Sequence, residues 1–375
     1  MTSQWAVKRT YTEVDLRQIE RNYLAYKASL PEDFEIMPVV KADAYGHGAV
    51  AVAKRLSPLG VTAFAVATLE EGIALRQSGI AGEILILGYT PPRLADRIYR
   101  YGLTQTLVDE AYARELASAT EKRLKVQYAV DTGMKRIGLD PACPASCERA
   151  IRSAAERFQL CGIFTHLAAA DSGAGAELTR LQSERFASIV RRVSDTSLPF
   201  IHCFNTAGGM RCSELSDGVG RLVRLGISLY GLAPSSEVIL PEGIRPALSW
   251  YATVASVRAV KRGESVGYGF GYVAERDIII ATVTVGYADG YSRAASGRAC
   301  VLINGRTAPV VGRVCMDQMM VDVSRHRHVR AGDRAVLIGA DGDLFITADE
   351  LGGMMGTIGY EVVCGISPRV ERRYI

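Results

Sequence analysis

One lysine stands where a cofactor could attach covalently. Lys41 directly follows the apolar run Ile36–Val40 and opens the segment KADAYGHG, which ends at Gly48. If this run is a barrel strand, the lysine lies at the barrel mouth. A partly desolvated amine there has a lowered pKa and can form a Schiff base with an aldehyde cofactor. A lysine at a strand exit can also pair with a neighbouring carboxylate, and its position alone leaves both interpretations open.

Other polar side chains follow later apolar runs in the same way, in the segments Thr165–His166, Asn205–Gly209 and Arg224–Ser228. Thr206 and the backbone N–H groups of Gly226 and Ile227 are suited to a phosphate dianion. Arg224 needs an acceptor, because a guanidinium in a barrel mouth is costly without one. A buried ion pair is its structural alternative. Arg136 lies in the Gly-rich segment DTGMKRIG and is suited to a carboxylate.

The apolar runs predict a barrel that brings these residues together. Eight short β-rich runs precede residue 226: Ile36–Val40, Ala63–Val66, Ile84–Leu87, Gln105–Val108, Val126–Val130, Cys161–Phe164, Phe200–Cys203 and Leu222–Leu225. Between most of them, apolar residues recur three to four positions apart, as in Leu69–Gln77 and Ala111–Ala119, which is typical of helices. This alternation favours a parallel (β/α)₈ barrel over an open doubly wound sheet, with the chemistry at the carboxyl ends of the strands.

The pattern of residue types along the sequence changes after about Pro246. The segments that follow are short, β-branched and interrupted by Gly, as in Trp250–Val260, Ile278–Val285, Cys300–Ile303 and Ala308–Cys315. Asn304 and Gly305 stand between two apolar runs and predict a tight hairpin, because both residue types tolerate positive φ. We therefore expect a (β/α)₈ barrel over residues 12–244 and an all-β domain over residues 245–375, with residues 1–11 packing on the latter.

The amino-acid composition argues against several classes of protein. The chain has 375 residues, 48% of them hydrophobic and 22% charged, and 44 Lys and Arg against 40 Asp and Glu give a net charge of +4. This excess is thinly spread, so we expect no nucleic-acid partner. No apolar stretch reaches the roughly 18 residues of a membrane helix, and the N-terminus lacks the apolar core of a signal peptide. Eight cysteines without zinc-ligand spacing predict neither a disulfide scaffold nor a metal site. We expect a reduced, soluble, cytoplasmic protein.

Five ordered segments resemble the signatures of the alanine racemase family, pyridoxal-phosphate-dependent enzymes of fold type III. They are KADAYGHG (41–48), DTGMKRIG (131–138), RLGISLYG (224–231), GYADG (286–290) and GRVCMDQ (312–318). The resemblance extends to Tyr360–Val362 and so covers nearly the whole chain, and KADAYGHG together with CMDQ is highly specific. It implies an isomerase that interconverts L-alanine and D-alanine and supplies D-alanine for the peptidoglycan of the cell wall.

The resemblance implies two acid/base groups in an active site shared between the subunits of a homodimer. Lys41 would carry pyridoxal 5′-phosphate as an internal aldimine, and Tyr268 would come from the β domain of the second subunit. The cofactor stabilises the Cα carbanion, and racemisation removes a proton from one face and returns it to the other. A free tyrosine with a pKa of about 10 is a poor base at neutral pH, so nearby positive charge must lower its pKa.

The resemblance also implies the remaining site residues. Arg224 would face the pyridine nitrogen and keep it unprotonated, because a guanidinium does not release its proton. His166, which taken alone is more often a satisfied core histidine, would orient Arg224. The other cofactor contacts, most of them to the phosphate, would be Tyr45, Asn205, Thr206, Gly226, Ile227 and Tyr360. Arg136 and the backbone N–H of Met316, the latter from the partner subunit, would bind the substrate carboxylate.

Ala129 departs from the family pattern. The family usually has a lysine two residues before the Asp-Thr-Gly turn, modified to a carbamate that holds the substrate-binding arginine. Ala129 cannot form a carbamate, so we expect a bound anion, chloride, to hold Arg136 with the help of Gln127. Gln127 is the candidate because it lies two residues earlier on the same face of the strand. The departure bears on substrate affinity more than on reaction type.

Three alternative functions can be compared with this one by the sequence features that each requires. A serine/alanine racemase of the vancomycin-resistance type shares every motif, although the large ring of Tyr360 favours a methyl over a hydroxymethyl group. A non-catalytic pyridoxal-phosphate-binding protein would share the barrel and its first-strand lysine but lack a β domain. A decarboxylase of the same architecture would set a carboxylate, not Arg224, against the pyridine nitrogen.

Overall fold

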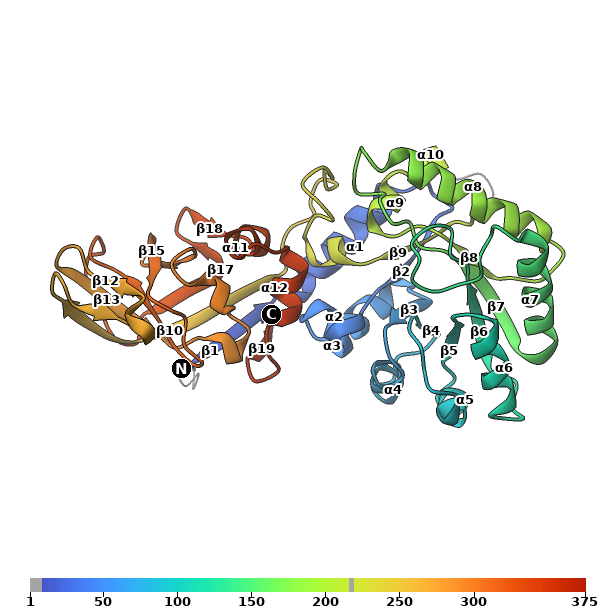
Figure 1. Cartoon of the computed structure of the whole chain (residues 1–375), viewed down its shortest axis with the longest axis horizontal. Helices are drawn as coiled ribbons and strands as arrows, with labels where there is room; N and C mark the ends of the chain where they lie inside the picture. Colours follow the sequence, from blue (N-terminus) through green and yellow to red (C-terminus); the bar gives the residue numbers. More distant parts are fainter. Residues whose placement is uncertain (1–8, 216–218) are drawn as a thin grey trace. The chain divides into compact units, whose positions relative to one another are not determined.

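A ring of parallel strands forms one of two units in the computed structural model, which describes residues 9–215 and 219–375 (Figure 1). The strands are β2 (Glu35–Pro38), β3 (Ala63–Val66), β4 (Glu83–Ile86), β5 (Thr104–Leu107), β6 (Lys125–Ala129), β7 (Gln159–Phe164), β8 (Phe200–His202) and β9 (Leu222–Leu225). Parallel ladders join β3 to β8 in order and β2 to β9. Single parallel bridges, Val39 to Ala65 and Phe204 to Val223, close the ring. The predicted (β/α)₈ barrel is confirmed.

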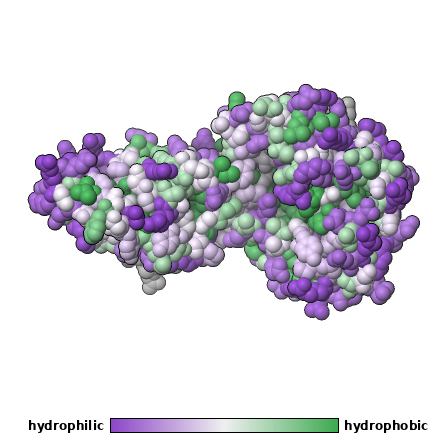
Figure 2. All heavy atoms as spheres, in the orientation of Figure 1, coloured by the Kyte–Doolittle hydropathy of each residue, from purple (hydrophilic) through white to green (hydrophobic). Residues whose placement is uncertain are grey.

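Helix α1 (Leu16–Ala28) precedes β2. Further helices lie between the strands: α3 (Ala49–Leu56), α4 (Leu69–Gln77), α5 (Ala95–Arg100), α6 (Glu110–Ser118), α7 (Pro144–Arg157), α8 (Ala176–Arg192), α9 (Thr206–Met210) and α10 (Cys212–Leu215). The expected helix over Leu69–Gln77 has the bounds of α4. It begins there because Thr68 and Glu71 form a capping box, in which each side chain binds the other's backbone N–H. Hydrophilic residues cover most of the visible face of this unit (Figure 2).

The second unit is built on a nine-stranded sheet in the order β18-β17-β14-β15-β16-β13-β10-β1-β19. Its strands are β1 (Thr10–Val14), β10 (Leu248–Val260), β13 (Ile278–Val283), β14 (Cys300–Ile303), β15 (Arg306–Val311), β16 (Met319–Asp322), β17 (Arg334–Asp341), β18 (Leu344–Ile346) and β19 (Glu371–Tyr374). A small hairpin, β11 (Ser265–Val266) with β12 (Tyr272–Val273), and the helices α11 (Ala348–Met355) and α12 (Gly359–Gly365) complete it. The predicted β domain is therefore present.

The hairpin between β14 and β15 forms as its sequence predicts. Ile303 pairs with Arg306, which leaves a two-residue turn. Asn304 and Gly305 take φ values of 51° and 70°, and these positive values suit the twist of a tight hairpin.

The second unit gathers residues from distant parts of the chain. It comprises the described residues up to Gln18, with Tyr45–His47 and Pro246–Ile375, whereas Ile19–Ala44 and Gly48–Arg245 form the barrel unit. Strand β1 pairs antiparallel with β10 and parallel with β19, so the two ends of the described chain share one sheet. In residues 9–215 and 219–375, no helix combines the length and apolar character needed to cross a membrane.

Candidate active site

Lys41 begins a left-handed turn just after β2. The residues Ala42–Tyr45 all have positive φ, between 51° and 55°. This conformation costs L-residues about 1–2 kcal/mol each, so the surroundings must impose it. Part of that restraint comes from Glu71, whose carboxylate accepts a hydrogen bond from the N–H of Ala42 at 2.6 Å. Strained backbone of this kind concentrates at functional sites, and here it immediately follows the lysine that the sequence predicts to be reactive.

Arg224 is buried inside the barrel, and backbone carbonyls hold it. Its Nη2 donates to the carbonyl oxygens of Thr165 at 2.7 Å and Cys203 at 3.2 Å. Its Nη1 binds Nδ1 of His202, and Nη2 lies 3.3 Å from Nδ1 of His166. Within residues 9–215 and 219–375, no carboxylate pairs with Arg224, so the buried ion pair that the sequence left open is not present. Burial lowers the pKa of this guanidinium to about 10, which leaves it a cation at neutral pH.

Arg224 determines where the hydrogens of its neighbours lie. A guanidinium only donates, so Nδ1 of His202 accepts and its Nε2 carries the hydrogen, which it donates to Oε1 of Gln127 at 2.7 Å. Burial, reinforced by the charge of Arg224, holds the pKa of His202 well below its ordinary value. Burial and the neighbouring cations do the same to His166. Both imidazoles are therefore neutral at neutral pH.

The side chain of Gln127, which is expected to help an anion hold Arg136, binds His202. Its oxygen is used by His202, because the hydrogen order set by Arg224 requires an acceptor there. Its Nε2 is buried and has no hydrogen-bond partner among the described residues. Gln127 therefore presents a donor, not an acceptor, to whatever lies beside it, and a donor suits an anion or a water oxygen.

The predicted phosphate contacts at the ends of β8 and β9 lie together. The N–H of Gly226 donates to Oγ1 of Thr206 at 3.0 Å, and Ile227 is buried at the start of the 3₁₀ turn Ile227–Tyr230. Asn205 accepts from the N–H of Gly208 at 2.8 Å, which caps α9. The Asn205 side chain thus shapes the loop.

Arg136 lies in an exposed turn after β6. The carboxylate of Asp131 fixes this turn, since it accepts from the N–H groups of Gly133 at 3.1 Å and Lys135 at 2.8 Å. Among the described residues the Arg136 side chain has no hydrogen bond or ion pair. Its charge acts on His166, as do those of Arg224 and Lys41. These four side chains therefore gather at the carboxyl ends of the barrel strands.

The second unit contains the other predicted site residues. The rings of Tyr45 and Tyr360 meet edge to face, with centroids 6.2 Å apart, and burial raises the pKa of Tyr45. Tyr268 and Met316 are 70% and 53% exposed. The N–H of Met316 donates to no acceptor in the part of the chain that the structure describes. Both side chains are therefore accessible to solvent.

Sequence reasoning missed His202, which contacts Arg224 more closely than His166 does. Its signal is present but weak: His202 is the one strongly polar residue in the apolar run Phe200–Cys203, which places it at an inward-facing position.

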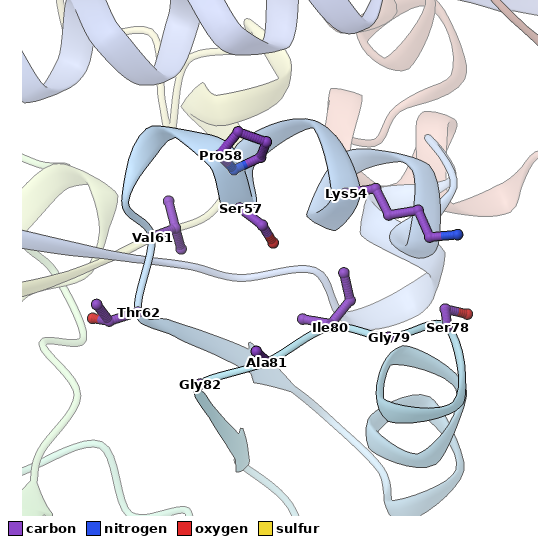
Figure 3. Close-up of a pocket in the computed structure, with 10 residues that line it drawn as sticks. All are labelled: Lys54, Ser57, Pro58, Val61, Thr62, Ser78, Gly79, Ile80, Ala81 and Gly82. Atoms are coloured by element: carbon purple, nitrogen blue, oxygen red, sulfur yellow. The ribbon is translucent and has the colours of Figure 1, made fainter.

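A cavity of about 450 Å³, lined by residues that include Val61, Thr62 and Gly82, lies at the amino ends of β3 and β4 (Figure 3). It contains none of the predicted site residues.

Comparisons with known proteins identify the family of this chain. The chain matches the family models "Alanine racemase, N-terminal domain" over residues 14–234 and "Alanine racemase, C-terminal domain" over residues 247–374. An alanine racemase of Symbiobacterium thermophilum is 43% identical over 374 residues, which cover 98% of this chain and 97% of that protein.

Solved structures agree as well. An alanine racemase of Clostridium difficile superposes with a TM-score of 0.90 at 36% identity, covering 98% of this chain and 96% of that one. An alanine racemase of Bartonella henselae with covalently bound pyridoxal phosphate gives a TM-score of 0.84 at 27% identity, covering 98% and 100%. The chain belongs to the alanine racemase family, whose enzymes depend on pyridoxal phosphate.

Proposed function

We propose that this protein interconverts L-alanine and D-alanine with Lys41 and the Tyr268 of a partner subunit as its two acid/base groups. The observation that carries this proposal is the buried cation Arg224, which has no carboxylate partner among the described residues and acts on His166 together with Lys41 and Arg136. Pyridoxal phosphate fits: Arg224 matches its ring nitrogen, and the Thr206 and Gly226 pair matches its phosphate. When bound, this cofactor supplies the electron sink that makes the substrate Cα–H acidic.

The protein's own groups would transfer the protons and bind the substrate. Nζ of Lys41 would hold the cofactor and, once the substrate amine has taken its place there, would move a proton on one face of the substrate Cα, while the Tyr268 hydroxyl would do so on the other face. Arg224 would donate to the ring nitrogen and, because a guanidinium keeps its proton, would leave that nitrogen unprotonated. Arg136 and the N–H of Met316 bind the substrate carboxylate, a charge-assisted contact.

The phosphate contacts are proposed from the family resemblance. Thr206 offers a hydroxyl, whose oxygen already accepts from the N–H of Gly226, Ile227 offers a backbone N–H, and Tyr45 and Tyr360 carry phenol hydroxyls. Neutral donors suffice for a phosphate dianion when several converge on it. Asn205 acts on this set by shaping the loop that carries Thr206.

The exposure of Tyr268 and Met316 supports a homodimer in which each β domain completes the partner's site. We place the enzyme in the cytoplasm, where D-alanine is made for peptidoglycan. A serine/alanine racemase shares every motif on which the resemblance rests. The ring of Tyr360 favours alanine, because a pocket bounded by a large ring accommodates a methyl group better than a hydroxymethyl group.

Racemisation of L-alanine and L-serine, measured side by side with and without added pyridoxal phosphate, tests this function. We expect L-alanine to be racemised at least roughly 10-fold faster, the discrimination that one small group in a pocket provides. Equal or faster turnover of L-serine would assign the chain to the serine/alanine type. No turnover of either substrate by cofactor-loaded protein would identify a non-catalytic binding protein.

Because Ala129 cannot carry a carbamate, we also predict that the activity depends on chloride. If chloride bound beside Ala129 and Gln127 holds Arg136, activity rises with chloride at constant ionic strength when the counter-anion is bulky, and bicarbonate has no specific effect. The buried Nε2 of Gln127 supports this, because it is a donor that lacks an acceptor among the described residues. Ala129→Lys should reverse the preference, giving bicarbonate dependence. An enzyme indifferent to chloride would contradict the idea.

A further inference from the structure

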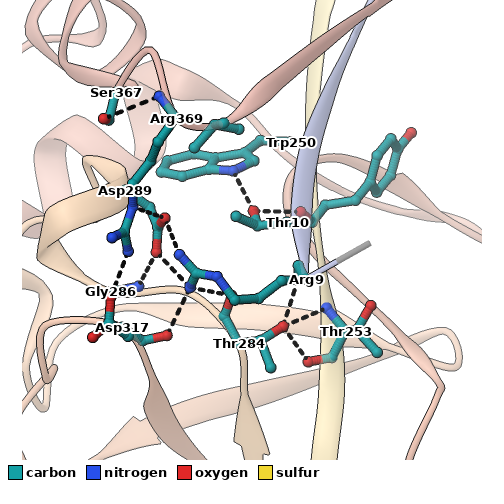
Figure 4. A network of polar contacts seen from close by, with 12 residues as sticks. Arg9, Thr10, Trp250, Thr253, Thr284, Gly286, Asp289, Asp317, Ser367 and Arg369 are labelled. Carbon is teal, nitrogen blue, oxygen red and sulfur yellow. Dashed lines mark hydrogen bonds and ion pairs between the residues drawn. The ribbon is translucent and has the colours of Figure 1, made fainter. Parts of the chain in front are cut away.

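Four charged residues form a network in the second unit that the proposed reaction does not use (Figure 4). Its centre is the fully buried carboxylate of Asp289, which accepts from Arg9 Nη1 at 2.9 Å, from Arg9 Nη2, and from Arg369 Nε at 2.7 Å. Arg369 Nη2 donates to Oδ1 of Asp317 at 2.6 Å. Two carboxylates balance two guanidiniums. We call Arg9, Asp289, Asp317 and Arg369 the Asp289 cluster.

The cluster holds the residue next to Met316 from two directions. Arg9 Nη1 donates to the backbone oxygen of Asp317 at 2.9 Å, while Arg369 binds the Asp317 side chain. Both arginines are in turn bound to the carboxylate of Asp289. The loop that carries Met316 is thus attached to a buried anion through two cations, although it lies far from Arg9 and Arg369 in the sequence.

The turn that contains Asp289 is attached to the same loop by its backbone. The N–H of Ala288 donates to the carbonyl of Met316 at 3.0 Å, and the N–H of Tyr287 donates to that of Cys315 at 3.1 Å. The approach is close enough that a Cβ at Gly286 would lie 2.2 Å from the Cys315 oxygen. These contacts occupy the carbonyls of the loop but leave the Met316 N–H unused.

We propose that Asp289 is a positioning residue for the substrate carboxylate, acting through the two arginines and Asp317 to aim the Met316 N–H. The inference rests on the proposed function, in which that N–H binds substrate in the partner's site. Removing the carboxylate charge leaves two neighbouring guanidiniums without their shared anion, so they repel each other and shift the Asp317 that both of them bind. Binding geometry at a reacting centre tolerates little displacement, so the effect falls on substrate binding.

The first test is the steady-state kinetics of Asp289→Asn. We expect KM for both alanine enantiomers to rise roughly 10- to 100-fold, with kcat changed by less than about 3-fold. Asp333→Asn is the matched control, because this carboxylate lies in the same unit, accepts from the N–H of Arg330 at 3.0 Å and does not touch the Met316 loop. It should leave KM unchanged. If Asp289→Asn does not fold, Asp317→Asn keeps the buried carboxylate and should raise KM in the same way.

The second test asks which subunit needs Asp289. In hybrids of Asp289→Asn with Lys41→Ala subunits, one site combines an intact Lys41 with the partner's intact Asp289, so activity with wild-type KM should appear. In hybrids with Tyr268→Phe subunits, no site has Lys41, Tyr268 and Asp289 all intact, so KM should stay high.

The outcomes separate the two proposals. If the wild-type protein does not racemise alanine, the proposed function fails. If it does, but Asp289→Asn leaves KM unchanged or lowers kcat alone, the positioning role is overturned. Recovery of a low KM with Tyr268→Phe but not with Lys41→Ala would also overturn it, since Asp289 would then serve the site of its own barrel.

Discussion

Lys41→Ala protein is expected neither to racemise alanine nor to retain a cofactor that borohydride can fix. The methyl group has no nucleophilic nitrogen and no proton to exchange, so covalent attachment and one acid/base group are lost together. We expect activity to fall by at least about 10³-fold, the upper part of the range for a general acid/base group. The measurement is borohydride reduction of cofactor-loaded protein, followed by digestion and the mass of the peptide that contains residue 41.

A matched control separates this lysine from other amines near the site. Lys135 stands beside Arg136 in an exposed turn, and its charge is 4.0 Å from the Asp131 carboxylate. Lys135→Ala should keep the reducible link and most of the activity. A wild-type protein that stays colourless after reconstitution, or a cofactor fixed at another lysine, would contradict the assignment of Lys41 as the residue that carries the cofactor.

Mixing two inactive variants is expected to restore activity. A hybrid of Lys41→Ala and Tyr268→Phe subunits contains one site with both defects and one with neither, if Tyr268 serves the partner's site. Random exchange makes half of the dimers hybrids, so about a quarter of the wild-type activity should return. The exposed positions of Tyr268 and Met316 on the β unit are the structural reason for this expectation.

Subunit exchange must be demonstrated separately, for example with two tags of different mass. As a control, Lys41→Ala subunits mixed with subunits that carry both substitutions should regain nothing, because no hybrid then contains an intact site. No recovery in the main experiment, despite proven exchange, would mean that both acid/base groups come from one chain.

The barrel could be predicted from sequence because its strands are short, apolar and separated by helices with a clear period. The predicted run Leu222–Leu225 and the helix Leu69–Gln77 have the bounds that the structure gives. These are local properties of the chain. The place of β1 between β10 and β19 could not be predicted, since it pairs segments from opposite ends of the sequence and no local pattern encodes such a pairing.

The candidate site, too, could be predicted from the sequence only in part. Lys41 and Arg224 could be singled out because a charge at the end of an apolar run is conspicuous. The hydrogen order from Arg224 through His202 to Gln127 could not, because it depends on which residues of β6, β8 and β9 face one another across the barrel. The two-sided attachment of the Met316 loop depends likewise on Arg9, whose partners lie more than 270 positions away.

Strand β1 has a consequence for how the protein is made. It leaves the ribosome first among the described strands, yet its neighbours in the sheet, β10 and β19, begin at Leu248 and Glu371. At about 5–20 residues per second, β1 waits on the order of ten seconds or more for β10, and β19 emerges later still. The barrel's strands are complete by Leu225, so the barrel can form while an unpaired strand stays attached to its amino end. We expect nascent chains halted before Leu248 to show a protected barrel but a protease-sensitive β1.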